Sequence, residues 1–276
     1  MPELPEVETV ARALRPLEGA RLTNFIVNDK KVWFESECEP EEFIGKNLTA
    51  IKRRGKYLIY DFGNLYILQH LRMTGKMLPD DSAIIPAKIR STNSKQLRCE
   101  FRFDRGNYFF YDPRRFGTLT AVRDLAHYWK KKKIAPDPIE EESAAREHFM
   151  QAMGNTKRPA KASLLDQSII AGVGNIYADE ALFALGIHPL TISARIKKTA
   201  ELFSLTRAIL EKAIKARGTT VYNYVNPDGV AGSYALELKV YGRTGEPCPR
   251  CKTKKIQRLV ITGRSSHFCA HCQKRS

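Results

Sequence analysis

Four cysteines near the C-terminal end constrain the fold of this chain more than any other feature. They follow the spacing Cys248-x2-Cys251, then 17 residues, then Cys269-x2-Cys272. Each CxxC pair fits a tight turn that presents two sulfur atoms to one ion, so the spacing predicts a tetrahedral zinc site with four thiolate ligands. Disulfide bonds, which are typical of secreted proteins, are the alternative. We therefore expect one structural Zn²⁺ as the cofactor.

The residues between the two cysteine pairs, KTKKIQRLVITGRSSHF, predict a β-hairpin. Two short strands flank the turn TGRSS, and Arg264 lies at its tip. A unit this small has little core of its own, so the metal has to hold it together. The hairpin is then suited to bring Arg264 to a phosphate or a groove of nucleic acid. A structural zinc ribbon whose charges are only solvated is the alternative.

The charge balance indicates the same class of partner. The chain has 276 residues, with 46 Lys and Arg against 30 Asp and Glu, which gives a formal net charge of +16. An excess of this kind favours a polyanionic partner, and nucleic acid is the usual one. A merely basic protein, or one that binds a membrane surface, is the alternative. No stretch reaches the roughly 18 apolar residues of a membrane-spanning helix, so we expect a cytoplasmic protein.

Hydrophobic periodicity divides the chain into a β-rich part and a helical part. After a first helix over 5–19, alternating runs such as LTAIKRR, KYLIYDF, NLYILQH, LRCEFRF and NYFFYD predict strands. From about residue 140 the period becomes helical, and a loop is expected over 218–234. The expected fold class is α+β with several domains: 1–130, a helix plus a β-sandwich or barrel; 131–140, a linker indicated by KKKK and APDP; 141–238, a helical domain; and 239–276, the zinc hairpin.

The first ten residues, MPELPEVETV, are only partly explained by a helix. Pro5 and the acidic residues suit a first helical turn, because proline is tolerated there and carboxylates favour the positive end of the helix dipole. The segment lacks the basic stretch and the apolar core of a signal peptide. Neither consideration explains why Pro2 and Glu3 stand before the helix.

Further motifs place cations and glycines at turns and strand ends. They are KRRGKY, QHLRMTGK and DPRRFG in the β-rich part, and GVGNIY at 172–177. An apolar residue beside an arginine on a loop is what a side chain that inserts between bases needs, although Met73 and Phe116, taken singly, are better explained as core residues. GVGNIY lacks the third glycine of a nucleotide-binding motif, and predicts a helix–turn–helix whose turn amides bind phosphate.

Together and in this order, these motifs resemble those of formamidopyrimidine-DNA glycosylase, a bacterial family that removes oxidised purines such as 8-oxoguanine. PELPEVE resembles the family's N-terminal signature, and KRRGKYL, HLRMTGK and DPRRFG resemble its β-domain motifs. LLDQSIIAGVGNIYADEALF resembles its helix–two-turns–helix motif, and the two CxxC pairs resemble its zinc finger. The resemblance implies a monomeric glycosylase and lyase, associated with the bacterial nucleoid, that acts on double-stranded DNA containing oxidised purines or abasic sites.

The resemblance also gives Pro2 a chemical role. If Met1 is removed, the Pro2 nitrogen becomes a free secondary amine, and an α-amino group titrates near pH 8 (about 7.7–8.0), so a useful fraction is neutral at pH 7. The amine would attack C1′ of the deoxyribose and expel the base, and the resulting Schiff base permits β- and then δ-elimination. Glu3 is implied as the acid/base, Glu6 as its support, and Lys56 as a contact to phosphate near the lesion.

The remaining implied residues contact DNA. Met73, Arg114 and Phe116 match the three residues that fill the gap left by the extruded nucleotide, with Arg114 facing the orphaned cytosine. The other implied DNA-binding residues are His70, Lys161, Asn175, Tyr241 and Arg264, of which Lys161 matches a lysine linked to handling of the oxidised purine. The segment GTTVYNY (218–224) resembles a base-capping loop, in which Thr219, Thr220 and Tyr222 are the base-recognition residues.

Two positions depart from the family pattern. Thr74 stands where many members carry glutamate, and Arg217 stands where a small residue is common, which leaves the purine preference open.

Two other functions compete with the removal of oxidised purines. The endonuclease VIII branch prefers oxidised pyrimidines, but its N-terminus typically reads PEGPE and it lacks the full Met-Arg-Phe trio, so Leu4 and the intact trio argue against it. A non-catalytic zinc protein that binds damaged DNA gives no reason for Pro2 and Glu3.

Overall fold

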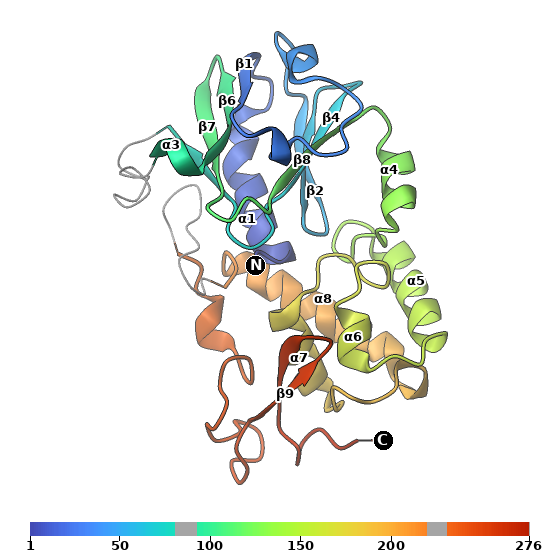
Figure 1. The fold of residues 1–276 in the computed structure, drawn as a ribbon. Helices are drawn as coiled ribbons and strands as arrows, with labels where there is room; N and C mark the ends of the chain where they lie inside the picture. The colour runs from blue at the N-terminus through green and yellow to red at the C-terminus, as the bar shows by residue number, and fades with distance from the viewer. Residues whose placement is uncertain (81–92, 220–230, 276) are drawn as a thin grey trace. The chain divides into compact units, whose positions relative to one another are not determined.

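The structure, a computed structural model, describes residues 1–80, 93–219 and 231–275. The chain divides into two compact units, Met1–Lys132 with Arg217–Ser233, and Lys133–Ala216 with Tyr234–Ser276. The sequence assigns the segment 218–224 to the helical domain, but its described residues group with the first unit. Figure 1 shows the elements of each unit in chain order.

The first unit is a β-sandwich with a helix beside it (Figure 1). One sheet has the strand order β1-β6-β7-β5 and the other β2-β3-β4-β8, and the pairs between these strands are antiparallel. The strands are β1 (Leu22–Val27), β2 (Ala50–Arg54), β3 (Tyr57–Asp61), β4 (Tyr66–His70), β5 (Lys76–Pro79), β6 (Leu97–Phe103), β7 (Gly106–Tyr111) and β8 (Thr118–Val122). The five strands predicted from alternation are confirmed as β2, β3, β4, β6 and β7, and the sheets form a sandwich rather than a barrel.

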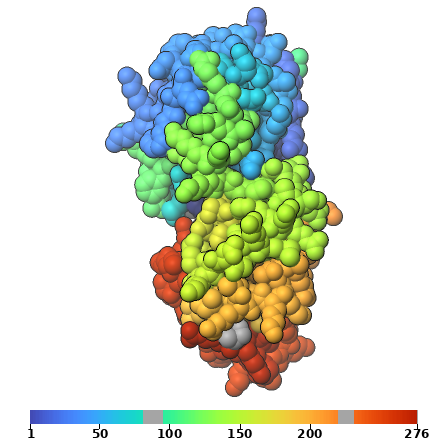
Figure 2. Space-filling model, turned by 90° about the vertical axis from the view of Figure 1, so that its right-hand side faces the viewer, coloured from blue at the N-terminus to red at the C-terminus, as the bar shows by residue number. Residues whose placement is uncertain are grey.

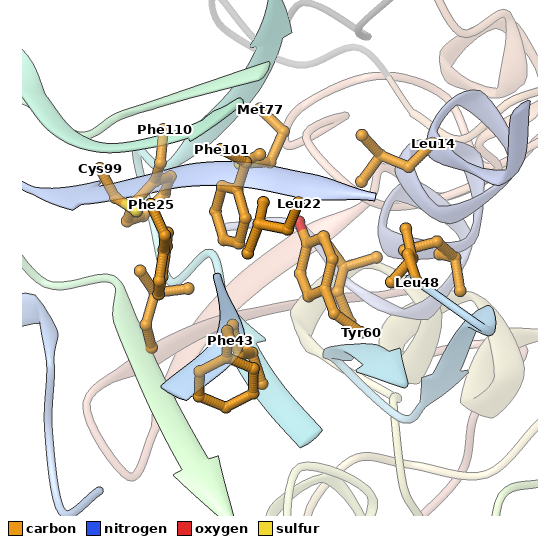
Figure 3. Packing of buried hydrophobic residues seen from close by; sticks show 14 of the residues in the cluster. Leu14, Leu22, Phe25, Phe43, Leu48, Tyr60, Met77, Cys99, Phe101 and Phe110 are labelled. Atoms are coloured by element: carbon orange, nitrogen blue, oxygen red, sulfur yellow. The ribbon is translucent and has the colours of Figure 1, made fainter. Parts of the chain in front are cut away.

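Aromatic and aliphatic side chains from both sheets form the core of the sandwich (Figure 3). Tyr60 of β3 stacks on Phe101 of β6, with 4.9 Å between ring centroids and 12° between ring planes. Phe25 of β1 lies 4.7 Å from Phe101, again between ring centroids. Fully burying a large apolar side chain contributes about 1.5–3 kcal/mol to the free energy of folding. This core therefore stabilises the strands from which the loops of the site extend.

Helix α1 (Leu4–Leu14) packs its apolar stripe onto this core. Val7, Val10, Ala11 and Leu14 are buried, as their helical spacing predicts. Pro5 lies in the first turn, and a short 3-10 turn (Arg15–Leu17) follows the helix. The helix expected over 5–19 is therefore confirmed as α1 plus this turn.

Helix α4 (Leu125–Lys132) replaces the first part of the expected linker. The sequence predicts a linker over 131–140, but Lys130, Lys131 and Lys132 form the last turn of α4, which is bright green in Figure 2. Tyr128 and Trp129 are buried and anchor the helix, and Lys132 Nζ lies 2.6 Å from Glu35 Oε2. Cations favour the negative end of a helix dipole, so the run is the solvated end of a packed helix.

The second unit is mainly helical and ends in a β-hairpin. Its elements are α5 (Glu142–Gly154), α6 (Ala160–Leu164), α7 (Asn175–Leu185), α8 (Thr199–Lys215), β9 (Gln257–Ile261) and β10 (Arg264–Phe268). Helices α5 and α8 reach the surface, yellow-green and orange in Figure 2. A short helix α3 (Asn93–Gln96) precedes β6 in the first unit. Within the described ranges, no helix has the length and apolar character needed to cross a membrane.

Candidate functional site

The start of the chain places Pro2 and Glu3 in buried positions directly before α1. Pro2 is buried, and Glu3 is 3% exposed. Glu3 is the N-cap of α1, and its carboxylate accepts the backbone N–H of Glu6. Glu6 returns the contact, because its Oε2 accepts the backbone N–H of Glu3 at 2.8 Å. This reciprocal capping box fixes both carboxylates. While Met1 is attached, the Pro2 nitrogen is an amide and is not nucleophilic.

Glu6 also joins the helix start to the segment that the sequence predicts as the base-capping loop. Its Oε1 accepts the backbone N–H of Thr219 at 2.7 Å. Gly218 precedes this contact with φ of +81°, and a Cβ atom there would lie 2.7 Å from Glu6 Oε1. Glycine is therefore required both by the backbone conformation and by the space. Thr220 and Tyr222 lie outside the described residues.

Buried polar residues gather where β2, β3 and β4 begin or end. Arg53 Nε donates to Glu8 Oε2 at 3.0 Å and ties β2 to α1. Lys56, between β2 and β3, is buried. His70 ends β4, and its Nδ1 accepts the backbone N–H of Arg72 at 3.0 Å. Burial, with further contributions from Arg72 and Lys56, lowers the pKa of His70 to about 3. His70 is therefore neutral at pH 7 and carries its proton on Nε2, where it is a hydrogen-bond donor.

Met73, Arg114 and Phe116 form an exposed cluster on the first unit. Met73 and Phe116 are each 49% exposed, so neither is a core residue. Arg114 Nη1 lies 3.4 Å from the Met73 sulfur, and the guanidinium carbon of Arg114 lies 4.6 Å from the centre of the Phe116 ring. The structure thus brings together the three residues that the sequence predicts to fill the gap in the duplex. Large apolar side chains exposed side by side are typical of binding surfaces.

Asp112 holds the two loops that carry this cluster, and sequence analysis did not single it out. Its buried carboxylate accepts the backbone N–H groups of Phe116 at 2.9 Å and Gly117 at 2.7 Å through Oδ2. Its Oδ1 accepts the N–H of Arg114 at 3.2 Å and the hydroxyl of Thr74 on the other loop. The Asp-Pro pair at the start of DPRRFG was the available signal, because aspartate before proline favours a turn.

In the second unit, α6 and α7 flank the turns of the predicted helix–two-turns–helix motif. Asn175 is the first residue of α7, after Gly174 as N-cap. The side chain of Gln167 holds the turns: its Nε2 donates to the carbonyl of Val173 at 2.9 Å, and its Oε1 accepts the N–H of Gly172 at 2.9 Å. A helix N-terminus favours a phosphate through its free N–H groups and its dipole.

Lys161 has a position that the sequence does not indicate. Its side chain is fully buried, and its Nζ donates to Asp179 Oδ1 at 2.6 Å and to the carbonyl of Asn175 at 2.8 Å. Lys161 therefore lies in an ion pair between α6 and α7, with no exposed side-chain surface in the described chain.

Tyr241 is half-buried, and its ring meets the ring of His267 edge to face with 4.9 Å between centroids.

The four cysteines converge as their spacing predicts. Their sulfur atoms all lie within 4.8 Å of one another, and the pairs Cys248–Cys272 and Cys251–Cys269 are both separated by 3.8 Å. A disulfide would require about 2.05 Å between sulfurs, whereas a tetrahedral zinc with bonds of about 2.3 Å places its sulfurs roughly 3.8 Å apart. The cysteines are therefore the ligands of one structural Zn²⁺, which agrees with the prediction.

The hairpin turn is tighter than the sequence predicts. We expect TGRSS to be the turn, but Arg264 pairs with Ile261 and begins β10. Thr262 and Gly263 alone form the turn, with φ of +47° and +75°. Two residues with positive φ make the turn that matches the twist of paired strands. Arg264 follows the turn and is exposed, whereas Ser266 of the same strand is buried.

Comparisons with known proteins cover the whole chain. Three family descriptions match consecutive parts: the formamidopyrimidine-DNA glycosylase N-terminal domain (1–119), the formamidopyrimidine-DNA glycosylase H2TH domain (134–224) and the zinc finger found in FPG and IleRS (245–275). A formamidopyrimidine-DNA glycosylase from Solibacter usitatus is 38% identical over 280 residues, covering 100% of both chains. One from Pediococcus pentosaceus is 43% identical over 282 residues, covering 99% of both.

Solved structures give the same result. A Lactococcus lactis FPG mutant in complex with a Fapy-dG containing DNA has a TM-score of 0.87 and 33% identity, covering 99% of this chain and 100% of that one. The MutM (FPG) protein from Thermus thermophilus has a TM-score of 0.85 and 33% identity, covering 100% of both chains. The chain described here is thus a zinc-containing member of the formamidopyrimidine-DNA glycosylase family, the bifunctional glycosylases and abasic-site lyases that repair damaged bases in DNA.

Proposed function

We propose that this enzyme excises oxidised purines, 8-oxoguanine and formamidopyrimidines, from duplex DNA with Pro2 as the nucleophile. The observation that carries the proposal is the buried Pro2-Glu3 pair, in which Glu6 fixes the carboxylate and the backbone of Glu3. Once Met1 is removed, a secondary amine stands next to a carboxyl group of fixed orientation. The Lactococcus lactis relatives, crystallised with Fapy-dG or abasic-site DNA, support this substrate class.

The chemistry follows from the amine. The neutral Pro2 nitrogen attacks C1′, the bond from C1′ to the base breaks, and the base leaves with that electron pair and takes up a proton. C1′ is then bonded to both the Pro2 nitrogen and O4′. The nitrogen loses its proton and the C1′–O4′ bond breaks as O4′ takes up a proton, which opens the sugar ring and gives the iminium. The iminium acidifies the C2′ proton, whose loss expels the 3′ phosphate, and a second elimination expels the 5′ phosphate. Water then hydrolyses the iminium and frees Pro2. Glu3 exchanges protons with the sugar and the nucleophile, and the zinc only holds the hairpin.

Extrusion of the damaged nucleotide precedes this chemistry, because the sugar and base are out of reach inside the stacked duplex. Met73 and Phe116 fill the gap, and Arg114 faces the orphaned cytosine. The exposure of Met73 and Phe116 and their contacts with Arg114 support these roles. The residues proposed to contact phosphates are Lys56, His70, Asn175, Tyr241 and Arg264. The enzyme acts as a monomer at the bacterial nucleoid.

Borohydride trapping tests the proposal. The enzyme is incubated with duplex DNA carrying one 8-oxoguanine opposite cytosine, borohydride is added, and the cross-linked peptide is identified by mass spectrometry. We expect an adduct on Pro2, and none from a form in which an N-terminal extension keeps Pro2 in a peptide bond. An adduct only with oxidised-pyrimidine DNA would favour an endonuclease VIII-like enzyme. No adduct from protein with a free Pro2 would favour non-catalytic binding of damaged DNA.

A Gly218→Ala variant is expected to excise the base at least about tenfold more slowly, equivalent to about 1.4 kcal/mol in the barrier. The added methyl group meets Glu6 Oε1 and disturbs the carboxylate that serves Glu3 and Thr219. Gly45→Ala is the matched control, since Gly45 has nearly the same φ (+83°) but nothing within 4 Å of its Cβ position. Equal single-turnover rates for the two variants would contradict this role of Glu6.

A Thr74→Val variant is expected to lose part of the preference for cytosine opposite the lesion, and Asp112→Asn more of it. Both changes weaken the link between the loops that carry Met73 and Arg114. The measurement compares excision of 8-oxoguanine opposite cytosine and opposite adenine. Thr23→Val is the control, because it also removes a donating hydroxyl, to the Arg102 carbonyl, at an exposed site. An unchanged preference in both loop variants would show that Asp112 does not position Arg114.

A further inference from the structure

Helix α7 carries two adjacent buried acids that no step of the proposed chemistry uses. Asp179 and Glu180 lie in the second turn of the helix that begins at Asn175, and both are almost fully buried. A buried carboxylate is costly unless it is paired and hydrogen-bonded. Both are satisfied, and their partners lie on segments that bear proposed phosphate contacts.

Asp179 connects α6, α7 and the zinc hairpin. Its Oδ1 accepts from Lys161 Nζ at 2.6 Å, and Lys161 also donates to the carbonyl of Asn175. Its Oδ2 accepts from the backbone N–H and from Nδ1 of His267, both at 2.9 Å. His267 lies in β10, the strand that begins with Arg264. One carboxylate thus fixes the strand of Arg264 against the first turn of α7.

Glu180 does the same for the segment before the zinc site. Its Oε2 accepts the backbone N–H of Lys239, and its Oε1 accepts those of Val240 and Tyr241, all at 2.9 Å. Three N–H groups on one carboxyl group define the path of this segment, because hydrogen bonds are directional. Apolar packing has no such direction. The backbone of Tyr241 is therefore positioned from α7 as well.

We propose that Asp179 and Glu180 are positioning residues for DNA binding, which hold Asn175, Tyr241 and Arg264 in register for one DNA backbone. Lys161 completes the arrangement by neutralising Asp179 and bonding to Asn175, which explains its burial without contact to the damaged base. This inference rests on the proposed function, since the three phosphate contacts are themselves part of that proposal.

A double-mutant cycle between Asp179→Asn and Arg264→Ala tests the proposal. Affinity for duplex DNA with a stable abasic-site analogue is measured over a range of salt concentrations, where each phosphate neutralised by a Lys or Arg side chain contributes about 0.9 to the slope of log K against log salt. We expect either single variant to reduce the slope by about 0.9, and the double variant to lose no more than either single one. Losses that add in the double variant would overturn the positioning role.

Three controls make the cycle decisive. Glu201→Gln removes an exposed acid of α8 and adds the same charge as Asp179→Asn, so it shows what net charge alone does. Zinc content, expected to stay at one ion per chain, separates a displaced hairpin from an unfolded one. If Asp179→Asn loses zinc, Glu180→Gln and Tyr241→Phe form a second double-mutant cycle. Losses of DNA affinity that add in its double variant would again overturn the proposal.

The two proposals fail in different ways. If Arg264→Ala leaves the salt slope unchanged, the phosphate contact in the proposed function is wrong, and the positioning role of Asp179 falls with it. If Arg264→Ala reduces the slope but the cycle is additive, Arg264 contacts DNA without help from Asp179, and only the present inference is overturned.

Discussion

Replacing Glu3 with glutamine is expected to lower the rate of base excision by about 10²–10⁴-fold, the usual contribution of a positioned acid or base. The variant keeps a side-chain carbonyl that can accept the backbone N–H of Glu6, so the start of α1 stays capped. The backbone N–H of Glu3 still donates to Glu6. The variant loses the ability to exchange a proton at this position. The measurement is the single-turnover rate of base excision on 8-oxoguanine DNA.

The chain offers a close control for this prediction. Glu39 is also the N-cap of a helical turn and forms a capping box with Glu42, but on the surface of the sandwich. Glu39→Gln makes the same chemical change in the same local motif, and we expect a wild-type excision rate from it. Thermal unfolding should be nearly unchanged in both variants. A wild-type rate for Glu3→Gln would mean that Glu3 is only a helix cap.

The strands that sequence analysis missed are those that depend on distant partners. Alternating patterns identified β3 and β4, which pair with neighbours a short turn away. β1 pairs with β6, and β8 pairs with β4, each across a long stretch of chain. Strand preference depends on cross-strand neighbours more than on the segment itself. No local pattern could therefore identify these strands.

The sequence predicts a helix where an apolar stripe stabilises it, and misses one that is stabilised by the burial of a few aromatic residues. The helix expected over 5–19 is α1, whose stripe of Val7, Val10, Ala11 and Leu14 packs onto the core. α4 has a short apolar face, and its lysine run suggested a linker; burial of Tyr128 and Trp129 makes it a helix. Tertiary packing, which the local sequence does not contain, supplies most of the stability of a short helix.

The residues of the candidate site also divide into those that a local pattern predicts and those that depend on distant partners. The zinc ligands follow from spacing, because each CxxC pair is a local motif. The residues that support the site are single acids without periodicity, and their partners are remote: Asp179 bonds to His267 across 88 positions, and Glu6 bonds to Thr219 across 213. Asp112, Asp179 and Glu180 became visible only when the fold brought these segments together.

Loss of the zinc is expected to unfold the hairpin and weaken binding to lesion DNA while leaving the chemistry of Pro2 in place. Around the cysteines, the described apolar cluster contains only Phe183, Val240 and Ile256. Zinc binding to such a site supplies about 10–16 kcal/mol, far more than so few side chains contribute. A hydrogen bond to a charged group is worth about 1.5–3 kcal/mol, so losing the Arg264 contact alone predicts roughly 10- to 100-fold weaker binding.

Cys248→Ser and Arg264→Ala separate the metal from the contact. Both should weaken DNA binding, but only Cys248→Ser should lose zinc and the protection of β9 and β10 amides from hydrogen exchange. Cys38→Ala, at a buried cysteine of the sandwich, should keep one zinc and normal affinity. Because Pro2 and Glu3 belong to the first unit, saturating DNA should restore the borohydride adduct in the zinc-free enzyme. Unchanged affinity after both substitutions would contradict the role of the zinc hairpin in binding, and an adduct lost even at saturation would mean that the metal also supports catalysis.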